Sequence, residues 1–197
     1  LPTEITSEIF MHCLPCSLFE ASSLQPSRAP MLLLHVCRSW RSLAISTPGL
    51  WVELCLLLRP LPKTLFDPET LDQLLSDWLE CAGARPLSLI LKGFTEGEEG
   101  RRLISTALNR LATRIQTLHL AINIDDFPDS EQIPGFPLLR NLQLSFPFNQ
   151  PTELSARENP IQIFNAASGL RGIHLYLQTS PTLLAIPWEQ LTEFTGE

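Results

Sequence analysis

The chain has 197 residues, of which 44% are hydrophobic and 18% charged, and its 21 acidic and 14 basic residues give a net charge of -7. This composition is typical of a folded globular protein. Nucleic acids and anionic membranes bind clustered Lys and Arg, so the acidic balance and the scattered basic residues argue against both as main partners. The longest apolar stretches, 31–36 and 54–58, are too short to span a bilayer.

The first fifty residues are typical of a small helical unit. Apolar residues recur at spacings of three and four from Ile5 to Leu14, which predicts a first helix with Pro2 at its first position. A second helix is expected to begin near Pro30 and to end at residues 47–49. One broad apolar face predicts it, formed by Leu32, Leu33, Val36, Cys37, Trp40, Leu43 and Ala44.

The pattern changes after a proline-containing linker at residues 59–66, because two prolines there cannot continue a helix or a central strand. Asp67 is a predicted N-cap, Pro68 the first residue and Gly83 the C-terminal cap of the next helix. The remaining periodicity predicts a strand at 86–91, a helix at 102–114 and a strand at 115–122.

A recurring phrase of six residues marks the second part of the chain. It consists of an apolar residue, two residues of any type, a Leu or Ile, one residue of any type and a Leu, as at 115–120. Including fainter copies at both ends, its central residues are Leu89, Leu118, Leu142, Ile173 and Phe194, separated by 29, 24, 31 and 21 residues. Leucine-rich repeats run at about 20–29 residues each. The pattern therefore predicts an α/β fold, an irregular leucine-rich-repeat-like solenoid of short parallel strands with helices in each unit. It would cover residues 67–197 and be truncated at the C-terminus; an ordinary α/β layer is the alternative.

Residues 1–58 resemble the F-box, with a trailing strand after the helices. The family pattern opens with Leu-Pro, a spaced Glu and an Ile-Phe pair, as at residues 1–10 here. It closes with Val-Cys-basic-x-Trp-basic at 36–41 and Pro-x-Leu-Trp at 48–51. The polar segment 16–30 departs from the family, where a short second helix is usual. An F-box joined to degenerate leucine-rich repeats is similar to the large fungal families of F-box proteins.

The resemblance implies a non-catalytic, substrate-recruiting adaptor subunit of a Skp–cullin–F-box ubiquitin ligase, in the cytoplasm or nucleus, without a cofactor. The F-box would bind the Skp-type adaptor, and the repeats would bind a protein substrate. A unit of about fifty residues is marginal on its own, and its surplus of large apolar residues also favours a partner surface. The residues expected to divide between that surface and the core are Leu1, Pro2, Ile5, Ile9, Leu14, Val36, Trp40, Leu50 and Trp51.

The alternative is a leucine-rich-repeat scaffold protein whose F-box-like helices only cap the solenoid. Exposure of Ile5, Ile9 and Trp51 would favour the adaptor. A substrate would be expected on the repeat strands, with Tyr176 as the best anchor, although solvated side chains without a role remain the simpler interpretation. The candidate substrate-binding residues lie between the repeat leucines: Thr117, His119, Asn141, Gln143, His174 and Tyr176.

Catalytic and metal chemistry find little support in the sequence. Cys13 and Cys16 form one close pair, but a structural zinc site needs four ligands and the other three cysteines form no second pair. An odd total of five cysteines favours reduced thiols. None of the four histidines belongs to a recognisable catalytic motif, so neither an enzyme nor a metal site is predicted.

Overall fold

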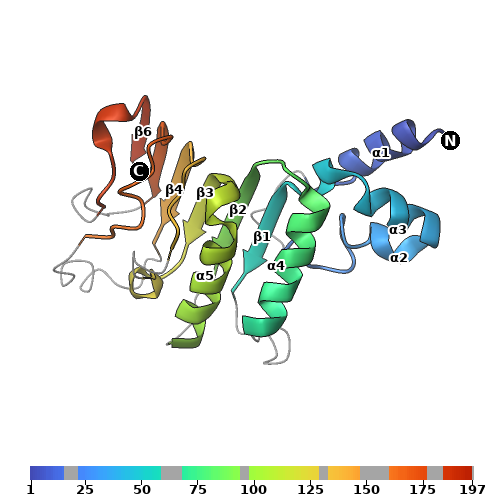
Figure 1. Ribbon diagram of the computed structural model, residues 1–197, viewed down its shortest axis with the longest axis horizontal. Coiled ribbons are helices and arrows are strands. Elements are labelled where there is room, and N and C mark those ends of the chain that lie inside the picture. Colours follow the sequence, from blue (N-terminus) through green and yellow to red (C-terminus); the bar gives the residue numbers. More distant parts are fainter. Residues whose placement is uncertain are drawn as a thin grey trace.

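A six-stranded parallel sheet forms the centre of the protein, and the strands lie in it in the order in which they occur in the chain (Figure 1). The computed structural model describes residues 1–15, 22–58, 68–93, 98–128, 133–146, 160–176 and 184–196. The strands are β1 (Glu53–Leu57), β2 (Leu87–Lys92), β3 (Ile115–Ala121), β4 (Asn141–Ser145), β5 (Gly172–Tyr176) and β6 (Glu193–Gly196). The prediction of an α/β fold with short parallel strands is confirmed.

The register of the sheet follows the recurring phrase in the sequence. Its five central residues and one residue of β1 pair in a single row: Leu54, Leu89, Leu118, Leu142, Ile173 and Phe194. All but Phe194 are buried. Because side chains alternate between the faces of a strand, the leucines two residues further on line the same face, where they are also buried.

Two long helices, α4 (Pro68–Ala82) and α5 (Glu98–Leu111), cover one face of the sheet beside β1, β2 and β3 (Figure 1). Helix α4 faces the sheet with Leu71, Leu75 and Trp78, all buried. It ends as predicted at Gly83, whose φ of 59° provides the left-handed conformation of a C-terminal cap. The predicted N-cap, Asp67, and the linker 59–66 lie outside the described residues.

The five apolar residues predicted to face the core on α5 are buried: Leu103, Ile104, Ala107, Leu108 and Leu111. A short 3-10 helix, η2 (Ala112–Arg114), continues directly into β3. The helix predicted at 102–114 begins four residues earlier, at Glu98. The prediction missed this first turn because Glu98–Arg101 precede the apolar stripe.

The expectation of a helix in every unit is wrong for the described residues after β3. There the connections contain the 3-10 helices η3 (Ile124–Asp126) and η6 (Trp188–Gln190), and turns. Prolines, which lack the N–H that an α-helix needs, recur in these segments. Two aromatic rings fill the corresponding part of the core, with the centroids of Phe136 and Phe164 5.5 Å apart.

The N-terminal residues form α1 (Thr3–His12), α2 (Leu33–Val36), α3 (Arg38–Ile45) and the 3-10 helix η1 (Pro48–Trp51). The prediction of one continuous second helix is wrong, because Cys37 is extended, with φ −158° and ψ 170°, and separates α2 from α3. Cys37 acts instead as the N-cap of α3, where its Sγ accepts a hydrogen bond from the backbone N–H of Trp40 at 3.4 Å.

The N-terminal helices and the sheet share one hydrophobic core that extends from Phe10 to Ile186. The strand expected to trail the F-box-like unit, β1, is the first strand of the common sheet. Its outer edge is covered by residues 22–24: the N–H of Ser23 donates to the carbonyl of Cys55 at 2.9 Å, and the N–H of Cys55 donates to Ser23 Oγ at 2.8 Å. Within the described ranges, no helix has the length and apolar character to cross a membrane.

Candidate functional site

Helix α1 has one buried side and one exposed apolar side. Phe10 is buried and packs on Trp40 of α3, with ring centroids 4.9 Å apart. Ile5 and Ile9 lie one turn apart and are 50% and 45% exposed. About half of each isoleucine faces solvent, so the stripe that they form is open to a partner.

The exposed apolar stripe of α1 leads to a shallow cavity of about 390 Å³. Cys13, one turn after Ile9, lines it together with Val36 and Trp40, which are 51% and 38% exposed, and Leu32, which is also exposed. We define the N-terminal apolar surface as Ile5, Ile9, Leu32, Val36 and Trp40. Single exposed apolar residues are common, but a group of this size on one small unit is typical of a binding surface.

Other residues predicted to contact the adaptor lie elsewhere. Leu1 and Pro2 are exposed at the start of α1, whereas Leu14 packs partly against the core. Leu50 and Trp51 are buried, so the prediction that they contribute to a partner surface is not retained. Both are the last residues of η1, which contacts α1, α3 and α4, and they belong to the core.

Trp51 joins the N-terminal helices to α4. Its Nε1 donates a hydrogen bond to the carbonyl of Ala44 at 2.8 Å, and its own carbonyl accepts one from Trp78 Nε1 at 2.6 Å. The two indole rings meet nearly edge to face, with centroids 4.9 Å apart. The sequence motif that contains Trp51 therefore fixes the orientation of the first three helices against α4.

The candidate substrate-binding residues do lie together on one face of β3, β4 and β5. Thr117 pairs with Asn141, and His119, Gln143 and His174 form the next row of the sheet. Tyr176 lies beside Ser145 and is exposed, as an anchor for a partner must be. The sequence phrase predicted this juxtaposition, since each residue occupies an equivalent position in its repeat.

His119 differs from its neighbours because it is only 6% exposed, so it is not available as a contact residue. Burial, with a smaller contribution from the positive charge of Lys92, lowers the pKa of His119 from 6.5 to about 4. The imidazole is therefore neutral at physiological pH. It lies between Ile90 and Gln143 in the sheet register, so its neighbour on β2 is a buried apolar residue and its neighbour on β4 is a half-buried polar one.

We expect acidification to destabilise the protein through His119. Its pKa is about 4 in the folded protein and 6.5 when unfolded, so the unfolded state binds more protons between these values. The free energy of unfolding should therefore fall by about 2 kcal/mol between pH 7 and pH 5 from this residue alone. Urea unfolding of the parent and of His119→Gln at both pH values measures the effect. The loss between pH 7 and pH 5 should be smaller in the variant, and equal losses would contradict the assignment.

The described cysteines are the free thiols Cys13, Cys37, Cys55 and Cys81. Burial raises the pKa of Cys55 to about 11, which makes this thiol unreactive. Cys16, the partner of Cys13 in the sequence pair, lies outside the described residues. In the part of the chain that the structure describes, no three His, Cys, Asp or Glu side chains gather where they could hold a metal ion.

A second hollow, not predicted from the sequence, lies between the N-terminal helices and α4. It has a volume of about 1090 Å³. One wall comes from Leu24, Met31, Leu34 and Ile45, and the other from α4. We call it the α4 groove. One signal was present in the sequence: α4 carries four acidic residues, Glu69, Asp72, Asp77 and Glu80, and no basic one.

Comparison of the chain with protein-family models, curated proteins and solved structures finds no match.

Proposed function

We propose that the protein is a substrate-recruiting adaptor that binds a Skp-type subunit of a cullin–RING ubiquitin ligase through the N-terminal apolar surface. The exposure of Ile5, Ile9, Val36 and Trp40 on a unit that resembles the F-box is the observation that carries the proposal. These residues come from two of the three sequence blocks that carry the resemblance, at 1–10 and 36–41. The role requires no catalytic group, and the proposed compartment is the cytoplasm or nucleus.

The second part of the proposal is that the sheet is an irregular leucine-rich-repeat-like array that presents a protein substrate. Backbone hydrogen bonds just before the strands support a repeating stack. The N–H of Arg140 donates to the carbonyl of Gln116, that of Arg171 to the carbonyl of Arg140, and that of Thr192 to the carbonyl of Arg171, each at 2.8 Å. Each unit thus contacts the next through equivalent atoms, as in repeat proteins. The candidate contacts that remain are Thr117, Asn141, Gln143, His174 and Tyr176.

A capping role for the N-terminal helices is the second candidate function. The hydrogen bonds between Ser23 and Cys55 and the burial of Trp51 favour it, since both tie the unit to the first strand. The described residues allow both roles at once, because the capping contacts involve the side of the unit that faces β1 and α4. The adaptor proposal uses Ile5 and Ile9, which face solvent.

Co-expression with a Skp-type adaptor and pull-down tests the proposal. The parent chain should retain the adaptor, and Ile9→Asp should abolish the complex. Burying a carboxylate in an apolar interface costs several kcal/mol, and about 1.4 kcal/mol corresponds to a tenfold change in affinity. Because Ile9 is already 45% exposed in the free chain, the variant should fold.

Leu138→Asp is the matched control, since Leu138 is 46% exposed and lies before β4, remote from α1 in the fold. It should bind the adaptor as well as the parent does. Absence of binding by a well-folded parent chain, even at tens of micromolar, would reject the adaptor role and leave the capping role.

A further inference from the structure

The α4 groove combines an apolar floor with an acidic rim. Its floor includes the buried indoles of Trp51 and Trp78 and the half-buried Leu74. Three carboxylates line the rim: Glu69, Asp77 and Glu80. Among the described residues that line the groove, none is a lysine or an arginine. A groove of this kind attracts positive charge and apolar surface together.

The α4 side of the groove is one face of the helix. Thr70, Leu74, Asp77 and Cys81 recur at spacings of four, three and four, which places them in one stripe along three turns. The buried leucines Leu71 and Leu75 belong to the neighbouring stripe and face the sheet. The stripe that lines the groove is only partly buried, because Leu74 and Cys81 pack at the edge of the core and still line the groove.

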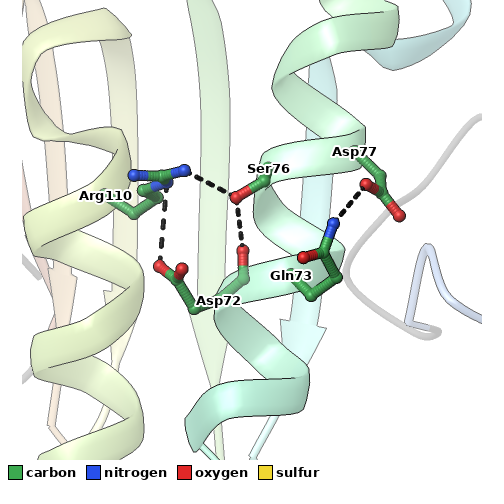
Figure 2. Close-up of polar contacts among 5 residues, drawn as sticks. All are labelled: Asp72, Gln73, Ser76, Asp77 and Arg110. Atoms are coloured by element: carbon green, nitrogen blue, oxygen red, sulfur yellow. Dashed lines mark hydrogen bonds and ion pairs between the residues drawn. The ribbon is translucent and has the colours of Figure 1, made fainter.

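The negative charge of the rim is not neutralised by the neighbouring helix. Figure 2 shows that Arg110 of α5 approaches α4 from the other side, where its guanidinium lies 3.7 Å from Asp72 and donates to Ser76 Oγ at 2.6 Å. Asp77 lies away from Arg110 and accepts a hydrogen bond from Gln73 at 2.8 Å. Among the described residues, no ion pair involves Glu69, Asp77 or Glu80.

Cys81, whose thiol lines the groove, is affected by the charges of two of these carboxylates. Burial raises the pKa of Cys81, and the negative charges of Glu80 and Asp77 raise it further. Glu80 and Asp77 thus lie close enough to Cys81 to act on a group that lines the groove.

We propose that the α4 groove binds a basic amphipathic helix of a partner protein, with apolar side chains on the floor and Lys or Arg against Glu69, Asp77 and Glu80. The length fits: from Glu69 to Cys81 the groove follows about 18 Å of helix, the rise of about 12 residues. Binding of such a helix in an apolar groove is a common mode of peptide recognition. The site is separate from the N-terminal apolar surface and does not depend on the ligase proposal.

Fluorescence anisotropy with a labelled Leu/Lys peptide of about 12 residues at amphipathic helical spacing tests the proposal. We expect the peptide to bind the parent chain with a micromolar Kd. The Kd should rise about tenfold or more in Asp77→Lys/Glu80→Lys, because the lysines of the peptide then meet positive charges instead of carboxylates. The matched control, Glu189→Lys/Glu193→Lys, changes the net charge equally at exposed positions near β6 and should leave the Kd within about twofold. The corresponding Leu/Glu peptide should not bind.

Alkylation of the cysteines tests whether the peptide binds in the α4 groove. Bound peptide should slow the modification of Cys81, which lines the groove, and leave that of the exposed Cys13 unchanged. Equal binding of the Lys and Glu peptides, equal losses in both charge variants, or an unprotected Cys81 would each overturn the proposal. So would a dimer of the chain that dissociates in Asp77→Lys/Glu80→Lys, since it would assign the groove to a second copy. No adaptor is present in these measurements, so their failure is distinct from failure of the ligase proposal.

Discussion

Replacing Trp51 by alanine is expected to lower the free energy of unfolding by about 3–5 kcal/mol, the cost of removing a large aromatic side chain from a core. The indole is 3% exposed and packs on Trp78. The variant also removes the hydrogen bond from Trp51 Nε1 to the carbonyl of Ala44 at 2.8 Å, although that carbonyl still accepts one from the N–H of Thr47 at 3.2 Å. Urea unfolding followed by circular dichroism measures the loss.

Two further variants make this result interpretable. Trp51→Phe keeps most of the ring and removes the indole N–H, so it should cost less than the alanine variant. Trp188→Ala removes an exposed tryptophan of η6 and should cost little. If Trp51→Ala cost no more than Trp188→Ala, the first three helices would be energetically independent of the sheet, contrary to the single core described above.

Gly93→Ala is expected to lower the free energy of unfolding by about 2–4 kcal/mol. Gly93 follows β2 with a φ of 130°, a conformation that residues with a Cβ rarely adopt. A Cβ at this position would lie 2.8 Å from the carbonyl carbon of Leu58, and a backbone atom cannot move aside as a flexible side chain does. The variant therefore combines strain at Gly93 with a shift of the strand end at Leu58.

Gly83→Ala is the matched control for this variant. Gly83 also has a positive φ, 59°, but among the described residues no atom beyond its immediate chain neighbours lies within 4 Å of the place that a Cβ would occupy. The expected cost is about 1–2 kcal/mol, from the left-handed conformation alone. Chemical unfolding of both variants measures the difference, and equal costs would show that the close approach of Leu58 is relieved without loss.

The strands and their register could be predicted because a period-two pattern repeats along the chain. Leu118, Leu142 and Ile173 are the centres of three copies of the phrase, and they pair directly in the sheet. The C-terminal cap at Gly83 was also predictable, since a glycine after an apolar stripe is a local signal. These features depend on short segments, and short segments are what a sequence pattern describes.

Features that depend on tertiary packing could not be predicted. Apolar periodicity alone cannot tell that Ile9 faces solvent while Phe10, the next residue, faces Trp40. It cannot show that Cys37 interrupts a helix, because the residues around it keep helical spacing. The burial of Trp51 and His119 depends on segments far away in the sequence. The α4 groove has the same origin, since residues 24–45 and α4 meet only in the folded chain.

The strand order also determines how the sheet can grow during synthesis on the ribosome. Each strand pairs only with its neighbours in the chain, so the template for a new strand has always been made already. Synthesis at about 5–20 residues per second supplies the 21–31 residues between successive central positions in a few seconds. Local pairing is orders of magnitude faster. The nascent chain can therefore add strands one by one, and until each next strand emerges, the last one exposes its edge to chaperones and to other nascent chains.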